Sequence, residues 1–135
     1  MTHTSPGSAA RPISPHVQVW RWHITMFASI AHRVTGVGLY GGALILAAWA
    51  VSLAAGPDAY AVFKAVLGSL LGKLVLFALT VSAFYHLAAG VRHLIWDTGR
   101  GLEPKKADVA CLASIVFGVA AAVLLWILAG LMGAF

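Results

Sequence analysis

Three long apolar stretches dominate this chain and cover residues 34–55, 65–91 and 109–135. Each is long enough for a membrane-spanning helix, which needs roughly 20 apolar residues. Only the second stretch contains a charge, and this is Lys73 near its start. A lysine near the end of a span can extend its ammonium group to the lipid headgroups. The sequence therefore predicts three membrane-spanning helices.

The composition excludes an ordinary soluble domain. Hydrophobic residues make up 61% of the 135 positions and charged residues 10%, which is more apolar surface than a soluble fold of this size can bury. We therefore expect an all-α membrane protein. The predicted organisation is a polar N-terminal segment and a three-helix membrane domain, at residues 1–20 and 21–135, with spans at about 22–55, 65–93 and 109–133.

The basic residues predict the orientation, because short loops rich in Lys and Arg tend to stay in the cytoplasm. Seven of the nine precede the first apolar stretch or lie between the second and the third: Arg11, Arg21, Arg33, Arg92, Arg100, Lys105 and Lys106. Only Lys64 and Lys73 lie on the other side. We expect a cytoplasmic N-terminus in a bacterial inner membrane, and a net charge of +5 that reflects topology and not nucleic-acid binding.

His86 is an ionisable side chain inside the second apolar stretch, and such residues in membranes usually mark function. On a helix it shares one face with small residues and with a second histidine: Ser82, Ala83, Ala89, Gly90 and His93. Small neighbours leave lateral room for a planar macrocycle beside an axial ligand. They also permit close helix packing, in which His86 hydrogen-bonds across an interface. Cys111 is the single cysteine, so any haem would be held without thioether bonds.

Ser29 and Arg33 are four residues apart and share a face at the start of the first span. A hydroxyl donor beside a guanidinium suits a carbonyl oxygen that gains negative charge, such as that of a quinone under reduction. Arg33 can equally serve only as a cytoplasmic anchor of the helix. His32 points to a different face, where it can serve a haem carboxylate or remain solvated.

Three motifs, in order along the chain, carry a resemblance to a known family. They are RPISPH at residues 11–16, SIAHRVTG at residues 29–36 and YHLAAGVRHLIWD at residues 85–97. With them, the chain resembles the cytochrome b membrane-anchor subunit of succinate dehydrogenase, respiratory complex II. Together with the three spans, the resemblance covers essentially the whole sequence.

The resemblance implies that this chain packs with a second small anchor subunit into a haem-binding helical bundle. His86 would be an axial ligand of haem b, the partner anchor would supply the other, and His32 and His93 would lie near the haem carboxylates. Ser29 and Arg33 would form part of the ubiquinone site. A flavoprotein with FAD and an iron–sulfur subunit would complete the oxidoreductase. Arg92 and Asp97 would form an interfacial ion pair or a docking surface for the iron–sulfur subunit.

Two alternatives remain at this point. The chain could be the anchor of a fumarate reductase, which runs the reaction in the opposite direction. It could also be a small structural or transport subunit without redox chemistry, in which His86 only packs. Transport is less favoured because helices one and three offer no further deep polar residue to continue a pathway.

Overall fold

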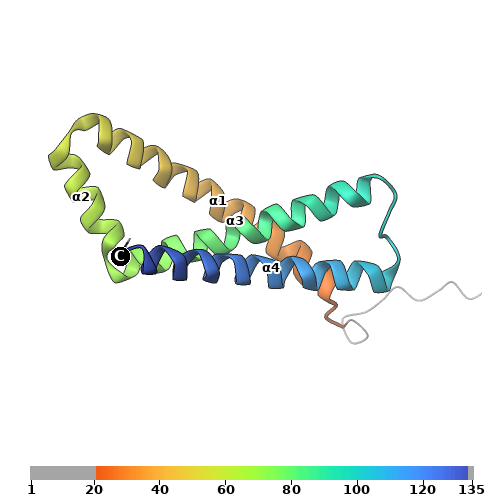
Figure 1. The fold of residues 1–135 in the computed structure, drawn as a ribbon. Helices are drawn as coiled ribbons and strands as arrows, with labels where there is room; N and C mark the ends of the chain where they lie inside the picture. Colours follow the sequence, from red (N-terminus) through yellow and green to blue (C-terminus); the bar gives the residue numbers. More distant parts are fainter. Residues whose placement is uncertain (1–20, 134–135) are drawn as a thin grey trace, which may run out of the picture.

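The computed structural model describes residues 21–133 and contains four helices (Figure 1). They are α1 (Ile24–Ala55), α2 (Pro57–Gly68), α3 (Leu70–Asp97) and α4 (Pro104–Leu131). No strand occurs in this part of the chain. The expected polar segment 1–20, including the first motif, lies outside the described residues.

Three of the helices are long and apolar enough to cross a membrane, which confirms the predicted three-span, all-α fold. They are α1, α3 and α4, with 32, 28 and 28 residues. Only 6, 11 and 22% of their most apolar segments are buried inside the chain. Most of the apolar surface therefore faces outward, as lipid-exposed or partner-exposed helices require.

The connection between the first two spans differs from the sequence prediction. Residues 57–68 form a separate helix, α2, so the second span begins at Leu70 and not near residue 65. Ser69 starts it as an N-cap, because its backbone is extended and its Oγ accepts a hydrogen bond from the Gly72 N–H at 3.1 Å. Gly56 ends α1 at a φ of 108°, and Pro57 follows in the first turn of α2.

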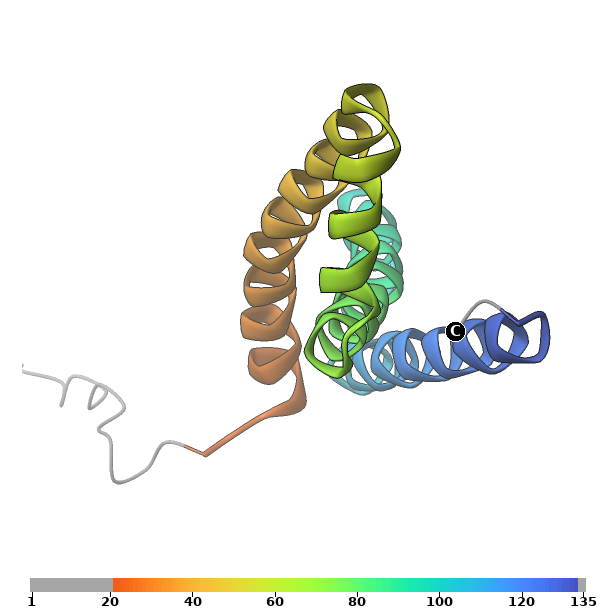
Figure 2. The same ribbon diagram turned by 90° about the vertical axis from the view of Figure 1, so that its left-hand side faces the viewer.

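The four helices form an open arrangement. α3 and α4 lie antiparallel along most of their length, while α1 crosses α3 and then diverges from it (Figure 1). α2 connects the distant end of α1 with the start of α3 and closes the third side of a triangle. Figure 2 shows that the C-terminal end of α1 also lies apart from the C-terminal end of α4.

Small side chains line the seam between α3 and α4. The buried residues of α4 recur every three or four positions, at Ala107, Cys111, Ser114, Gly118 and Ala122. A Cβ added to Gly118 would lie 2.7 Å from the Cβ of Tyr85 and 2.8 Å from its Cα. This close backbone approach is the packing mode of membrane helices, where small residues replace the hydrophobic effect as the source of tight contact.

We expect Gly118→Ala to destabilise the protein by about 1–3 kcal/mol, because the added methyl group meets backbone and not a flexible side-chain end. The measurement is the Tm of the detergent-solubilised protein. Gly41→Ala is the matched control, since a Cβ there meets no atom within 4 Å. Equal Tm values for both variants would contradict this account of the seam.

Candidate functional site

Three histidines meet where α1 crosses α3. The rings of His32 and His86 stack with their centroids 4.0 Å apart and their planes 10° from parallel. His93 lies one heptad after His86, with its ring centroid 5.1 Å from that of His32. The structure thus brings together the three histidines that the resemblance assigns to haem, although 54 residues separate His32 from His86.

His86 is held through one of its two ring nitrogens. Its Nδ1 lies 3.2 Å from the backbone oxygen of His32 and 3.3 Å from Thr35 Oγ1. A carbonyl oxygen can only accept a hydrogen bond, so this contact places the proton on Nδ1. Thr35 Oγ1 is 2.8 Å from the Ala31 carbonyl and donates there, which leaves its lone pairs free to accept from Nδ1–H. The other ring nitrogen, Nε2, takes no part in these two contacts.

Gly36 makes this ring position possible. A Cβ on Gly36 would lie 3.2 Å from His86 Cε1, which is tighter than ordinary van der Waals contact. The imidazole therefore rests against the α1 backbone where any side chain would press on it. Six residues further along α1, a Cβ added to Gly42 would likewise lie 3.2 Å from Leu79 Cδ2. Both glycines therefore let α3 side chains pack closely against the α1 backbone.

His32 has a buried Nε2 with no hydrogen-bond partner among the described residues. Buried polar atoms nearly always have a partner, so an atom without one fits a polar ligand group. The small residues expected to leave room beside His86 divide into two groups. Ala89 is fully buried within the chain and adds no open space, whereas a Cβ on Gly90 would meet nothing within 4 Å and Ala83 is exposed.

Ser29 and Arg33 lie on α1 beside this cluster. Ser29 is half-buried and Arg33 is exposed, and Arg33 forms no ion pair within residues 21–133. Ala28, next to Ser29, accepts a hydrogen bond at 2.6 Å from the buried hydroxyl of Tyr85. Tyr85 precedes His86 on α3, so this bond fixes the spacing between the serine and the histidine cluster.

Arg92 corrects one expectation from the sequence. It does not pair with Asp97 at an interface but is only 5% exposed and lies between α3 and α4. Its Nη1 donates to Cys111 Sγ at 3.0 Å, and its guanidinium lies 4.9 Å from the ring centroid of Trp96. Asp97 is exposed. The sequence alone does not predict the contact between Arg92 and Cys111 or the hydrogen bond of Tyr85. Both join different helices, and the spacing of residues along the chain does not reveal such contacts.

The sequence of residues 8–129 matches the family described as succinate dehydrogenase/fumarate reductase transmembrane subunit. The chain belongs to this family. Because the family is a transmembrane one and three helices can span a bilayer, the chain is a multi-pass membrane protein.

Individual relatives of this transmembrane subunit cover most of its length. The succinate dehydrogenase cytochrome b556 subunit of Paracoccus denitrificans is 40% identical over 114 residues, which are 84% of this chain and 88% of the relative. The b556 subunit of Rickettsia felis is 35% identical, over 87% of this chain and 91% of its own length. The mitochondrial succinate dehydrogenase cytochrome b560 subunit of Mus musculus is 33% identical, over 83% of this chain and 68% of its own length. The non-redox transport alternative is therefore set aside.

We expect Arg92→Ala to expose Cys111 to alkylation, because Cys111 is fully buried and the arginine contacts its sulfur directly. The measurement is the rate of N-ethylmaleimide addition to the Cys111 peptide, followed by mass spectrometry in detergent. The rate should rise severalfold above the protected wild type. Arg100→Ala, which removes an exposed arginine from the same end of the molecule, should leave it unchanged. Unchanged protection in Arg92→Ala would show that the helices alone cover the thiol.

Proposed function

We propose that this chain is the cytochrome b membrane-anchor subunit of a succinate dehydrogenase and binds haem b together with a partner anchor. The observation that carries the proposal is the orientation of His86, whose Nδ1 contacts the His32 carbonyl, so that Nε2 is the ring nitrogen not engaged by this contact. Metal-bound histidines characteristically donate their other ring N–H to such a group. The relatives' names, which specify cytochrome b subunits, support the same assignment.

The residues of the histidine cluster fit a haem. His86 would ligate the iron, and a histidine of the partner anchor would supply the second axial ligand. His32, with its unpartnered Nε2, and His93 would contact the haem carboxylates, since charge-assisted hydrogen bonds stabilise carboxylates at low dielectric. Held by two histidines, the haem would supply one-electron transfer. The chain's own contribution is to hold the imidazole in one orientation.

Ser29 and Arg33 would bind ubiquinone where the anchors meet the iron–sulfur subunit. Ser29 would donate a hydrogen bond to one quinone carbonyl, and Arg33 would stabilise the charge that develops on the oxygen during reduction. The exposed position of Arg33 leaves its guanidinium available for a group from outside this chain. Ubiquinone takes up two electrons and two protons, and a site at the cytoplasmic face gives those protons access to water.

The rest of the proposed enzyme lies in other chains. Succinate would be oxidised at FAD in a flavoprotein subunit, and electrons would reach the quinone through the clusters of an iron–sulfur subunit. The assembly would sit in a bacterial inner membrane with the N-terminus of this chain in the cytoplasm. A fumarate reductase anchor remains the second candidate, because the family includes both enzymes.

Substituting His86 tests the haem assignment. A reduced-minus-oxidised visible spectrum of the detergent-purified assembly should show a low-spin b-type signal, which His86→Ala should abolish. His23→Ala is the control, because this histidine is exposed and pairs with Asp108 at 3.5 Å outside the cluster. A full haem signal in an intact His86→Ala assembly would refute ligation by His86.

Substituting Arg33 tests the quinone site. Arg33→Ala should lower succinate–ubiquinone reductase activity by about 10²-fold, the effect of removing one donor from a developing oxyanion. Succinate oxidation with a soluble dye should stay close to wild type, because the flavin lies in another subunit. Arg33→Lys should recover part of the activity by restoring the charge without the planar donor pair. A parallel loss of both activities would indicate failed assembly and contradict a quinone-specific role.

A further inference from the structure

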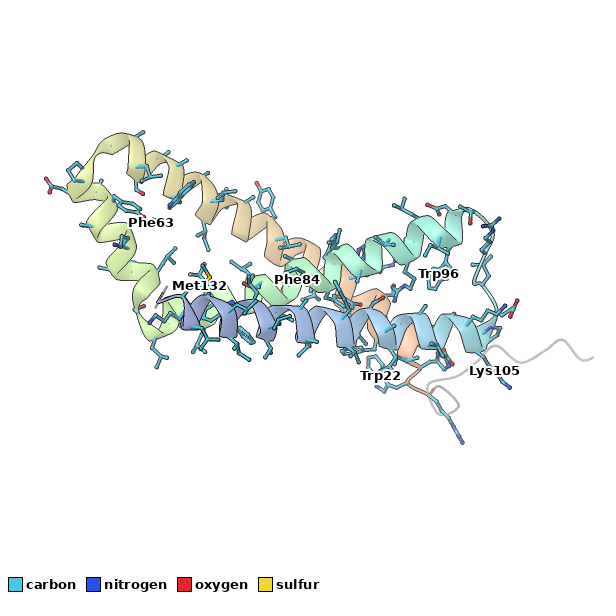
Figure 3. The ribbon with its side chains drawn as sticks, viewed as in Figure 1. Trp22, Phe63, Phe84, Trp96, Lys105 and Met132 are labelled. Atoms are coloured by element: carbon cyan, nitrogen blue, oxygen red, sulfur yellow. The ribbon has the colours of Figure 1, made fainter. Side chains whose placement is uncertain are left out.

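The hydroxyl group of Thr35 lies against the ring of His86 where α1 crosses α3. Thr35 Oγ1 is 3.3 Å from His86 Nδ1, and the backbone oxygen of His32 is 3.2 Å from the same nitrogen. Figure 3 shows this crossing near Phe84, two residues before His86 on α3. Two oxygens of α1, one from a side chain and one from the backbone, therefore face one ring nitrogen.

The backbone of α1 sets the direction of this hydroxyl group. Thr35 Oγ1 lies 2.8 Å from the Ala31 carbonyl oxygen and 3.0 Å from the His32 carbonyl oxygen, to which it donates. A threonine in a helix commonly donates to the preceding turn in this way, and the bond restricts its χ1 angle. Because the proton points along α1, the lone pairs of Oγ1 are available to the His86 ring. The hydroxyl group is thus oriented by its own helix.

The next residue, Gly36, brings the ring to the hydroxyl group. A Cβ on Gly36 would lie 3.2 Å from His86 Cε1 and 3.8 Å from His86 Nδ1. The imidazole therefore rests on the same turn of α1 that carries Thr35. Thr35 is itself half-buried, and a distance of 3.3 Å leaves no room for a water molecule between Oγ1 and Nδ1. The contact is direct, and it depends on both neighbouring residues of α1.

We propose that Thr35 is a positioning residue for His86, whose Nδ1–H bonds to its hydroxyl oxygen as well as to the His32 carbonyl. This role rests on the proposed binding of haem at His86. An imidazole that ligates a metal through Nε2 carries its proton on Nδ1 and is oriented by the acceptor placed there. Such an acceptor also makes the ring a stronger electron donor, which favours ferric over ferrous iron. Thr35 should therefore lower the midpoint potential of the haem.

The test is a redox titration of the complete assembly, purified in detergent and followed by its reduced-minus-oxidised visible spectrum. Thr35→Val keeps the shape of the side chain and removes the hydroxyl group. At a fixed ambient potential, its ratio of reduced to oxidised haem should rise about two- to tenfold, the range that one hydrogen bond supports. Thr35→Ser restores a hydroxyl group and should return the ratio toward the wild-type value. Thr35→Ala removes the same group and decides the result if Thr35→Val fails to assemble.

Thr80 of α3 provides a matched control. Its hydroxyl group donates to the Leu76 carbonyl oxygen at 2.7 Å and accepts from the ring N–H of Trp126 at 3.2 Å, so it makes the same two kinds of contact. It lines a largely apolar cavity of about 630 Å³ that no histidine lines. Thr80→Val should lower the Tm of the assembly without changing the redox ratio of the haem.

The outcomes separate the role of Thr35 from haem binding itself. An unchanged redox ratio in Thr35→Val and Thr35→Ala, at normal haem content, would overturn the role of Thr35 and leave ligation by His86 intact. An equal shift in Thr80→Val would also overturn it, because a general packing defect would then explain the change. Absence of a b-type signal from the wild-type assembly, or its persistence in His86→Ala, would instead refute the haem assignment and the role of Thr35 with it.

Discussion

The contact between His86 and the backbone of α1 is the interaction on which the candidate site depends. The Nδ1 of His86 lies 3.2 Å from the carbonyl oxygen of His32, and Gly36 leaves the room for the ring to approach. In a medium without water, a buried imidazole needs such a partner, because an unsatisfied polar group is costly there. The same contact aligns His32 in a stack with His86 and leaves the other ring nitrogen, Nε2, outside this contact.

The two sides of α3 have different physical roles. Its seam with α4 is tight and carries Gly118, Tyr85 and the buried pair of Arg92 with Cys111. Its crossing with α1 is local, and the helices then diverge around an apolar cavity of about 630 Å³. A buried guanidinium without a carboxylate depends on the thiol and the Trp96 face for compensation. The close-packed seam therefore supports the more open side of α3, which carries His86.

The membrane spans can be predicted from this sequence more accurately than the connections between them. The predicted end of the first span at residue 55 is confirmed, because the backbone preferences of Gly56 and Pro57, which follow it, act locally. The separate helix α2 is not predicted, since residues 65–69 are apolar or small and read as part of the second span. The break between α2 and α3 is visible in the structure, where Ser69 Oγ accepts a hydrogen bond from the Gly72 N–H. Arg92 was misplaced because a basic residue at the end of an apolar stretch has the same pattern whether it faces lipid headgroups or a neighbouring helix.

The sequence by itself determined that this is a three-span membrane protein, and its motifs selected His86, Ser29 and Arg33 as candidates. Hydropathy is a sum over neighbouring residues, so a single chain segment carries that information. Only the tertiary structure decided that His32, His86 and His93 form one cluster and that Nδ1 of His86 is the anchored nitrogen. Those features depend on where α1 crosses α3, and the close approach at Gly36 and the connection through α2 set that crossing.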